Sequence, residues 1–401
     1  MSEVIISGGK KLSGSVTVPP SKSIAHRLII AASLAKGESI IENVSFSEDI
    51  KATAGAMKAL GADIALLENK VKVLGINKEI KHTDTEIFCN ESGSTLRFMI
   101  PLALSFGGSF LFTGSSRLME RPLDSYFEIF DKVGIKYEKR ENGIFFSGKL
   151  DAGRYSLRGD VSSQYITGLI FALSRLNKRS EIEITTNLES AGYIDLTIDA
   201  LADFGVKVLK EGNKFIICEN QQFTPKNARV EGDYSQAAFY LVANAIGNDV
   251  SVLDLNANSH QGDKEILSVI DKMKNGGITL DVSQIPDLVP IITVLATQTE
   301  GVTHIINAGR LRIKESDRLS AISEELKKMG AKICEEPEGL VIEGKTKLKG
   351  ADVYAHNDHR IAMSLAIAAT VAEGEVKITN SECVKKSYGN FWDDYFSLQN
   401  R

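Results

Sequence analysis

Six stretches of the chain are hydrophobic on nearly every side of the helix that their sequence predicts. Each opens on a small polar or acidic residue of the kind that commonly begins helices. Most of these residues are roughly 70 positions apart, a spacing that indicates stacked supersecondary repeats. Because a helix that is apolar all round must be buried, six buried helices are predicted. The opening residues are Ser21, Ser92, Ser162, Asp233, Asp287 and Asp358.

The residues after each buried helix predict the same succession of elements. In the first repeat ESIIENV predicts a strand, SEDIKATAGAMKALG an amphipathic helix, and IALLE and KVKVL two short strands. In most repeats a glycine ends the second helix, where it closes the helix in the left-handed conformation. We therefore predict an α/β fold of six β-α-β-α-β-β units.

Two repeats depart from this pattern. The fourth is shorter than the others and is predicted to lack a strand, and the sixth ends after the helical stretch SYGNFWDDYF without its closing strands. The N-terminal strands EVIIS and SVTV are the natural replacement, so the start of the chain is expected to join the last three repeats. The prediction is a first domain of residues 19–230 and a second domain of residues 1–18 plus 231–401, with three repeats in each.

Buried helices surrounded by strands describe a two-domain, inside-out α/β barrel with outer sheets. The two chain crossings between the domains would lie near Pro20 and Glu231. Two short crossings side by side would make a hinge. The helix starts would then face the space between the domains, where backbone N–H groups and helix dipoles favour anions.

Composition narrows the class of protein. The chain has 401 residues, 43% of them hydrophobic, and a net charge of −5. That length favours two domains, and that charge gives no general case for binding nucleic acid or an anionic membrane. No stretch approaches the roughly 20 apolar residues of a membrane span, and the N-terminus does not read as a secretion signal. Four cysteines without paired spacing indicate a cytosolic protein with reduced thiols and support neither a zinc site nor a disulfide framework. We expect a cytoplasmic monomer without metal or cofactor.

Several helix starts carry cations, which the positive end of the helix dipole disfavours. Lys22 and Arg27 lie in the first turns of the first buried helix, and Arg360 opens the last one. A solvated helix start is the simple alternative for an isolated Ser-Lys-Ser. The repeated misplacement of charge favours an anion-binding site instead.

Other helix starts offer small or uncharged groups. Gly93 lies with Arg97 in a small-residue turn that could admit a phosphate or a carboxylate. The third buried helix begins with three hydrogen-bonding side chains, suited to a phosphate or a sugar hydroxyl, although capping needs only one of them. These three residues are Ser162, Ser163 and Gln164.

Two loops add further cations. Arg121 precedes a proline, where an exposed arginine is the default. If Ser316 caps the next helix, Lys314, Glu315 and Arg318 cluster at its start; an exposed alternating strand is the alternative.

Asp287 follows a proline at the start of an apolar helix. Capping would explain it, and a catalytic base is the other interpretation, because surrounding cations would keep the carboxylate ionised. The sequence contains neither a Walker loop nor a Rossmann fingerprint. The residues alone therefore predict transfer chemistry on two phosphorylated or carboxylated small molecules.

Seven motifs in order closely resemble the 5-enolpyruvylshikimate-3-phosphate (EPSP) synthase family over nearly the whole chain. They are PPSKSIAHR, SGSTLRF, RLMERP, SSQYITGL, EGDYSQAAF, IKESDRL and NDHRIAM. The resemblance implies two domains of three repeats that close over their substrates, the first domain on the shikimate 3-phosphate side. It also implies a role in chorismate and aromatic amino acid biosynthesis.

The reaction implied by the resemblance transfers the enolpyruvyl group of phosphoenolpyruvate to the 5-hydroxyl of shikimate 3-phosphate and releases phosphate through a tetrahedral intermediate. The implied catalytic residues are Lys22, Asp287 and Glu315. Phosphoenolpyruvate would be bound by Lys22, Gly93, Arg121, Gln164, Arg318, Arg360 and Lys386. Shikimate 3-phosphate would be bound by Lys22, Ser23, Arg27, Ser162, Ser163, Gln164, Ser190, Tyr193, Asp287 and Lys314. From the residues alone, Ser190 and Tyr193 predict only a helix start, and Lys386 only a solvated lysine.

The chain departs from the family pattern at three places. Glu91 and Ser92 stand where the family often has Asn-Ala, Phe98 stands where many members have proline, and Arg310 occupies a position often held by asparagine. Gly93 implies sensitivity to glyphosate, the inhibitor of this family, whereas Glu91 and Phe98 leave that sensitivity open.

Two other functions compete with this one. The related transferase that acts on UDP-N-acetylglucosamine has Lys-Asn near its first helix and a reactive cysteine on a loop, whereas here Ser23 follows Lys22 and GSSRLMERP has no cysteine. A non-catalytic anion-binding repeat protein, like the related RNA-terminal cyclase fold, is the second. Asp287 and Glu315 argue against it, because acids among so many cations would not help a protein that only binds anions.

Overall fold

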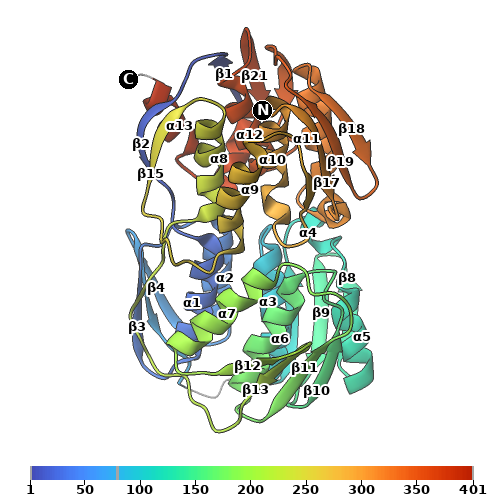
Figure 1. The fold of residues 1–401 in the computed structure, drawn as a ribbon. Coiled ribbons are helices and arrows are strands. Elements are labelled where there is room, and N and C mark those ends of the chain that lie inside the picture. The colour runs from blue at the N-terminus through green and yellow to red at the C-terminus, as the bar shows by residue number, and fades with distance from the viewer. Residues whose placement is uncertain (1, 78–80, 400–401) are drawn as a thin grey trace. The chain divides into compact units, whose positions relative to one another are not determined.

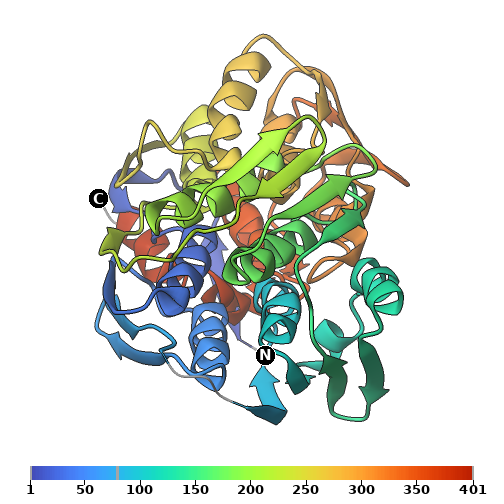
Figure 2. The ribbon, with the colours of Figure 1, turned by 90° about the horizontal axis from the view of Figure 1, so that it is seen from below.

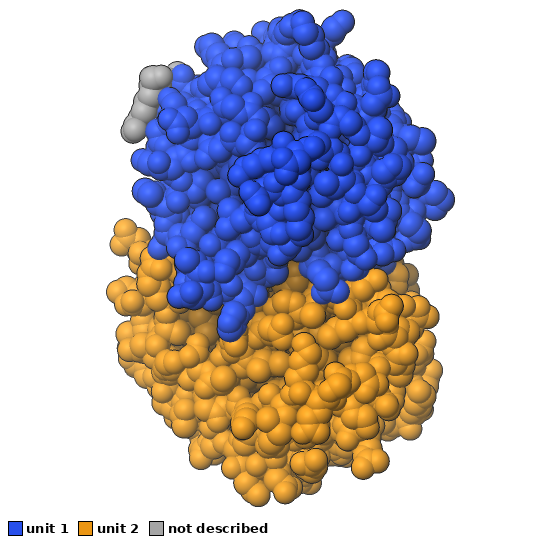
Figure 3. Space-filling model, viewed as in Figure 1, with its two compact units in different colours: residues 1–19, 232–401 blue, residues 20–231 orange. Residues whose placement is uncertain are grey.

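The computed structural model describes residues 2–77 and 81–399. By its internal contacts the chain divides into two compact units, coloured separately in Figure 3: unit 1 comprises residues 1–19 and 232–401, and unit 2 comprises residues 20–231. Each unit has a hydrophobic core of its own. None of the helices in the described ranges is long and apolar enough to cross a membrane.

Unit 2 contains three repeats, each with a buried helix, a strand, a second helix and three further strands, and the second repeat has the short helix α4 in addition (Figure 1). The first consists of α1 (Lys22–Leu34), β3 (Glu38–Glu42), α2 (Glu48–Ala59), β4 (Asp63–Leu67), β5 (Lys70–Leu74) and β6 (His82–Phe88). The second consists of α3 (Gly93–Phe106), β7 (Gly108–Thr113), α4 (Ser116–Met119), α5 (Asp124–Val133), β8 (Lys136–Arg140), β9 (Gly143–Gly148) and β10 (Arg154–Leu157). The third consists of α6 (Ser163–Arg175), β11 (Ser180–Ile184), α7 (Ala191–Asp203), β12 (Val208–Glu211), β13 (Lys214–Ile217) and β14 (Ala228–Arg229).

The strands of unit 2 form three four-stranded sheets, in the orders β14-β3-β5-β4, β6-β7-β9-β8 and β10-β11-β13-β12. In each sheet the last strand of one repeat runs parallel to the first strand of the next, and β14 returns to β3 of the first repeat. The view in Figure 2 shows these strands around α1, α3 and α6. The three repeats therefore close on themselves, with helices inside and sheets outside as predicted.

Unit 1 contains the other three repeats. The fourth consists of α8 (Tyr234–Ala245), β15 (Asp249–Leu253), the short 3-10 helix η1 (Gly262–Glu265), α9 (Ile266–Met273) and β16 (Thr279–Asp281). The fifth consists of η2 (Pro286–Leu288), α10 (Val289–Gln298), β17 (Gly301–Ile306), η3 (Gly309–Ile313), α11 (Arg318–Lys328), β18 (Lys332–Glu336), β19 (Gly339–Gly344) and β20 (Asp352–Tyr354). The sixth consists of α12 (His359–Ala369), β21 (Glu375–Thr379), η4 (Ser381–Lys386) and α13 (Phe391–Gln399).

The N-terminal strands complete unit 1, as the sequence predicts. β1 (Glu3–Ser7) pairs antiparallel with β21 of the sixth repeat, and β2 (Ser13–Thr17) pairs parallel with β15 of the fourth. The remaining sheet has the order β16-β17-β19-β18. The prediction that the fourth repeat lacks one strand is wrong: in the part of the chain that the structure describes, α9 is followed by β16 alone, so both strands of the hairpin are missing. Among the described residues β15 therefore pairs only with β2.

The six central helices, α1, α3, α6, α8, α10 and α12, are buried on nearly all sides, which confirms the prediction from their apolar sequences. In α1, for example, each residue from Ala25 to Ser33 is buried. Burial of this kind stabilises the fold through apolar area removed from water. It also leaves only the ends of these helices to carry polar chemistry.

The prediction that small polar or acidic residues begin the central helices is confirmed for four of them by side-chain caps. The side chains of Ser92, Ser162, Asp233 and Asp358 accept hydrogen bonds from the first turns of α3, α6, α8 and α12. The Ser21 side chain makes no such bond although the residue precedes α1. The prediction that Ser316 caps the next helix is wrong, because Asp317 accepts from the Ser320 N–H instead.

The two chain crossings between the units run side by side. The Ser21 N–H donates to the Glu231 carbonyl at 2.8 Å, and the Asp233 N–H donates to the Pro19 carbonyl at 3.0 Å. The crossings thus lie at Pro19–Pro20 and Glu231–Gly232. That they form a hinge stays a prediction.

Candidate active site

Lys22 is the first residue of α1, and its ammonium group forms an ion pair with the Asp49 carboxylate of α2 at 2.8 Å. Both side chains are largely buried. The acid offsets part of the unfavourable interaction between Lys22 and the positive end of the α1 dipole. Asp49 therefore fixes the position of Lys22, and this contact has no local signature because 27 positions separate the two residues.

A chain of buried hydroxyl groups links the starts of α1 and α3. His26 Nδ1 lies 2.7 Å from Thr53 Oγ1, which lies 2.7 Å from Thr95 Oγ1. The Thr95 hydroxyl donates in turn to Ser92 Oγ at 2.8 Å. Burial lowers the pKa of His26 to about 3, so its ring is neutral at physiological pH and takes part as a hydrogen-bonding group. The chain holds the two helix starts in a fixed arrangement.

Arg27 connects α1 to α7. Its Nε donates to the Thr197 hydroxyl at 2.8 Å, and its two terminal nitrogens donate to the carbonyls of Ser23 and Tyr193 at 2.7 Å. Burial lowers the pKa of Arg27 to about 10, and the group stays charged. Ser190 precedes α7 in a left-handed conformation and makes no side-chain cap. Arg27 thereby links Ser23 to Tyr193, and Ser190 lies beside them because its carbonyl accepts from the Tyr193 N–H at 3.1 Å.

Gly93 and Arg121 lie in direct contact. Gly93 is the first residue of α3, and a Cβ atom built on it would stand 2.5 Å from Arg121 Nη1. The absence of a side chain at this position therefore lets the guanidinium group lie against the helix start. Both residues belong to the predicted phosphoenolpyruvate set, and the structure brings them together.

Gly93→Ala is expected to raise the KM for phosphoenolpyruvate by about tenfold or more, because the methyl group displaces the Arg121 guanidinium and a charged hydrogen bond is worth about 1.5–3 kcal/mol. Steady-state kinetics with each substrate varied would measure it, and the KM for the second substrate should stay unchanged. Gly55→Ala in α2, where a Cβ atom meets nothing within 4 Å, is the matched control. An unchanged KM for phosphoenolpyruvate in Gly93→Ala would contradict the assignment.

The start of α6 presents Ser162, Ser163 and Gln164. Ser162 caps the helix, so two of the three side chains remain for other roles, as the sequence analysis anticipated. The Gln164 carbonyl accepts from Arg97 at 2.7 Å, and its amide donates to the Ser94 hydroxyl at 3.0 Å. Arg97 thus fixes the orientation of the Gln164 carboxamide. Its oxygen points to Arg97, and its NH₂ group points to Ser94 at the start of α3 and donates there.

In unit 1 the central residue is Arg318, which is almost fully buried at the start of α11. Its guanidinium group bonds to the carboxylates of Asp358 at 2.7 Å, Asp287 at 2.8 Å and Glu315 at 2.8 Å. Although burial opposes its charge, these three acids raise the pKa of Arg318 above its ordinary value. Burial also works against the charge of Asp358, but Arg318 lowers its pKa. The predicted residues Asp287, Glu315 and Arg318 therefore form one cluster.

Asp287 is not a helix cap. It lies in η2, before α10 begins, and the cap positions of η2 and α10 are held by Ile285 and Leu288. Its carboxylate instead contacts three cations: Arg318, Arg360 at 3.2 Å and Lys314 at 3.6 Å. Burial lowers the pKa of Lys314 to about 8, against the opposing attraction of Asp287. The capping interpretation is wrong, and the carboxylate among cations required of a catalytic base is present.

Lys386, at the end of η4, donates to the Asn357 carbonyl at 2.9 Å, one residue before the cap of α12. It is half-buried, whereas Lys385 is exposed. The interpretation of Lys386 as only a solvated lysine is therefore wrong. Its position beside the start of α12 depends on tertiary structure that the local sequence does not reveal.

Two departures from the family pattern have different surroundings. Phe98 is buried in α3, with its ring 6.2 Å from Phe171 and the Arg27 guanidinium 5.2 Å above it. Glu91, before the α3 cap, is exposed. Phe98 is therefore part of the hydrophobic core, whereas Glu91 lies on the surface next to the start of α3.

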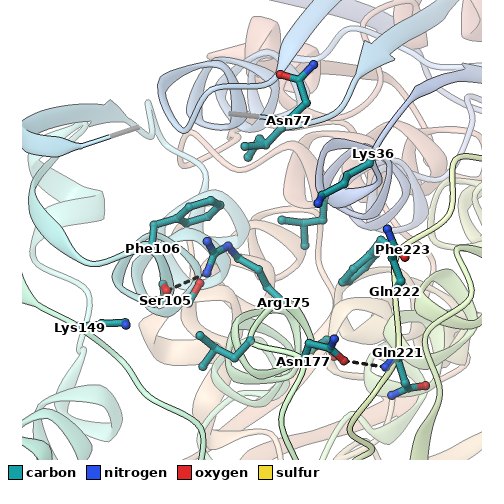
Figure 4. A pocket seen from close by; sticks show the side chains of 14 residues that line it. Lys36, Asn77, Ser105, Phe106, Lys149, Arg175, Asn177, Gln221, Gln222 and Phe223 are labelled. Atoms are coloured by element: carbon teal, nitrogen blue, oxygen red, sulfur yellow. Dashed lines mark hydrogen bonds between the residues drawn. The ribbon is translucent and has the colours of Figure 1, made fainter. Parts of the chain in front are cut away.

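A cavity of about 780 Å³ in unit 2 lies away from these residues (Figure 4). Its lining includes Leu34, Phe106 and Arg175, the last residues of α1, α3 and α6. Arg175 donates to the Ser105 carbonyl at 2.8 Å, as a cation at the negative ends of helices is expected to do. The predicted site residues stand at the opposite ends of the same helices, so this cavity is not the candidate active site.

One cluster within the described ranges has the spacing of metal ligands: Glu324, Glu325 and His356. Both oxygens of the buried Glu325 already accept from Lys328 at 2.9 Å, and the Tyr354 N–H donates to one of them. The group fastens α11 to β20. It contains no residue of the candidate site.

Solved structures share this fold. An EPSP synthase from Acinetobacter baumannii matches with a TM-score of 0.80 and 26% identity, covering 100% of this chain and 97% of that one. The enolpyruvyl transferase NikO from Streptomyces tendae matches with a TM-score of 0.76 over 98% of this chain and 96% of that one, at 14% identity. The fold is that of the enolpyruvyl transferases, which confirms the predicted architecture.

Sequence comparison gives the family. The model of EPSP synthase (3-phosphoshikimate 1-carboxyvinyltransferase) matches residues 6–395. A 3-phosphoshikimate 1-carboxyvinyltransferase of Clostridium perfringens strain SM101 is 49% identical over 99% of this chain and 98% of its own length. That of Clostridioides difficile strain 630 is 47% identical over 98% and 96%. The chain belongs to the EPSP synthase family, and the UDP-N-acetylglucosamine alternative is not favoured.

Proposed function

We propose that the chain transfers the 1-carboxyvinyl group of phosphoenolpyruvate to the 5-hydroxyl of shikimate 3-phosphate, with the residues described above as its active site. The observation that carries this function is the family match over residues 6–395. The clustering of the predicted residues within each unit supports the assignment of the site. The two units would be the two domains, with unit 2 on the shikimate 3-phosphate side.

In unit 2 the helix starts supply the binding groups for both substrates. Ser23, Arg27, Ser162, Ser163, Gln164, Ser190 and Tyr193 would hold shikimate 3-phosphate, and Lys22, Gly93, Arg121 and Gln164 would hold phosphoenolpyruvate. The N–H groups at the starts of α1, α3 and α6 add favourable dipoles for the phosphates. Lys22, held by Asp49, would contact both ligands and stabilise negative charge on phosphate.

In unit 1 the carboxylates perform the proton transfers. A proton adds to C3 of phosphoenolpyruvate, C2 becomes electrophilic, and the 5-oxygen attacks it while Asp287 accepts the hydroxyl proton. Loss of a proton from C3 then restores the double bond as the C2–O bond to phosphate breaks. Glu315 would serve C3, and Lys22 would assist. Lys314 would hold shikimate 3-phosphate together with Asp287, and Arg318, Arg360 and Lys386 would bind phosphoenolpyruvate.

We also propose that the enzyme acts as a cytoplasmic monomer without metal or cofactor, and that it binds neither nucleic acid nor a membrane. Its net charge of −5 supports the last point, because an acidic protein is repelled by polyanions.

Phosphate release with each acceptor tests the proposed function. Purified protein with phosphoenolpyruvate is expected to release phosphate in the presence of shikimate 3-phosphate and not with UDP-N-acetylglucosamine. No release with shikimate 3-phosphate, despite folded protein, would refute the proposal. Release with the UDP-sugar alone would instead establish the rival acceptor.

A further inference from the structure

Two polar side chains near Arg360 in unit 1 are not among the residues predicted to bind either substrate. Ser235, in the first turn of α8, is 7% exposed, and Asp263, in η1, is 4% exposed. They come from different elements of the fourth repeat, the one that has lost its hairpin. A buried carboxyl group is costly to place in a core, so its partners indicate what it does.

Ser235 lies between Asp263 and Arg360. The Arg360 Nη1 group donates to Ser235 Oγ at 2.6 Å, and the buried Asp263 carboxylate is near enough to Ser235 and Arg360 for both to act on its pKa. A hydroxyl group has one proton to donate and two lone pairs to accept. A guanidinium group can only donate, so Ser235 accepts from Arg360 through a lone pair. The hydroxyl proton is left for an acceptor, and the neighbouring Asp263 carboxylate is of the right kind.

On its other side Arg360 is held by Asp287. Nη1 donates to the Asp287 carbonyl at 3.1 Å, and Nη2 donates to its carboxylate at 3.2 Å. In the proposed mechanism Asp287 takes a proton from the substrate hydroxyl and loses its charge. At that step Arg360 loses its ionised contact, while Ser235 and Asp263 remain in place.

The charge of Asp263 is available for this role at neutral pH. Burial, followed by the negative charges of Asp287 and Asp233, raises the pKa of Asp263 to about 6, while Arg360 and the Ser235 hydroxyl act to lower it. The group is therefore mostly ionised above neutrality. The negative charge of this carboxylate polarises the Ser235 hydroxyl. The serine oxygen thereby becomes a stronger hydrogen-bond acceptor for Arg360.

We propose that Ser235 and Asp263 are positioning residues that hold the Arg360 guanidinium group in place to bind phosphoenolpyruvate while Asp287 changes its protonation state. This role rests on the proposed function, which makes Arg360 a ligand of phosphoenolpyruvate. Neither residue touches a substrate. The effect of removing them is therefore specific to the substrate that Arg360 binds.

Steady-state kinetics of Ser235→Ala, Asp263→Asn and the double variant test this proposal. Ser235→Ala is expected to raise the KM for phosphoenolpyruvate by about tenfold, the loss of one hydrogen bond to a charged group, with the KM for shikimate 3-phosphate unchanged. Asp263→Asn should change the same constant in the same direction. Since both residues act on the same Arg360 guanidinium group, the KM for phosphoenolpyruvate of the double variant should not exceed that of Ser235→Ala.

Ser364→Ala is the matched control, a buried serine on α12, the same helix as Arg360, whose hydroxyl has no hydrogen-bond partner within the described ranges. It should leave both KM values unchanged. Ser235→Cys, which keeps a side chain of similar size with a weaker donor and acceptor, serves if Ser235→Ala does not fold. An unchanged KM for phosphoenolpyruvate in folded Ser235 variants, or equal changes for both substrates, would overturn the proposal.

The wild-type protein distinguishes this inference from the proposed function. If it releases phosphate with shikimate 3-phosphate but the Ser235 variants keep the wild-type KM, only the inference fails. If the wild type is inactive, the proposed function fails, and calorimetric binding of phosphoenolpyruvate to wild type and Ser235→Ala still decides the inference. Equal affinities in that titration would overturn it, and weaker binding by Ser235→Ala would support it.

Discussion

Asp287→Asn is expected to lower kcat by about 10²–10⁴-fold, the range for loss of general acid–base help. The amide keeps the shape of the carboxylate but cannot accept the hydroxyl proton. The protein should stay folded, because Arg318 retains Asp358 and Glu315, and because Asp287 caps no helix. Single-turnover kinetics together with thermal unfolding would measure both quantities.

Asp271→Asn is the control for this prediction. Asp271 is an exposed acid of α9 whose partner is Lys274, outside the cluster, and its replacement should leave the rate unchanged. A near-normal kcat in Asp287→Asn would show that another group accepts the proton. A large loss of stability with a normal rate per folded molecule would make Asp287 a structural residue.

Arg318→Met is expected to lower the free energy of unfolding by about 3–5 kcal/mol, because it leaves buried acids without their shared cation. Asp358, whose side chain is fully buried, is the most affected. Arg312→Met is the comparison: its side chain is 28% exposed, against 2% for Arg318, so water screens its ion pairs with Asp317 and Glu335 and their loss should cost clearly less. Denaturant unfolding would compare the two variants.

The pH dependence of the Arg318 effect has a definite sign. In the wild type Arg318 lowers the pKa of Asp358, so this group contributes stability above its ordinary pKa and loses it as the pH falls through the lower folded value. In Arg318→Met burial alone would raise the pKa of Asp358, so protonation would relieve the variant. The difference in unfolding free energy between the wild type and Arg318→Met should therefore shrink as the pH falls from 7 towards 4. The ordinary pKa of an aspartate such as Asp358 is 3.8. A constant difference would argue against Asp358 as the cause.

The architecture could be predicted because apolar helices repeated along the chain can be buried only by stacking. Helix starts carry the site for the same reason: with the bodies of α1 and its equivalents buried, cations such as Lys22 and Arg360 stand at the ends, where a fold optimised for stability alone would favour acids. These signals are local, and so a single sequence contains them.

The remaining features depend on tertiary contacts. No local signal marks Asp49 or Asp263, because their neighbours Lys22 and Ser235 come from other helices. Asp287 resembled a cap since it precedes an apolar helix, yet Pro286 begins a short 3-10 turn that moves the start of α10 to Val289. The shorter length of the fourth repeat indicates that strands are absent. It does not say how many, and the described part of this repeat lacks two where the sequence predicts the loss of one.

In the proposed reaction the carboxyvinyl carbon skeleton passes intact to shikimate 3-phosphate. The most direct measurement follows phosphoenolpyruvate labelled with ¹³C at C2 by NMR during turnover with shikimate 3-phosphate. We expect the enol-phosphate signal to be replaced by that of a vinyl ether at the 5-oxygen, with one phosphate released for each ether formed. Phosphate release with labelled pyruvate as the only carbon product would contradict it.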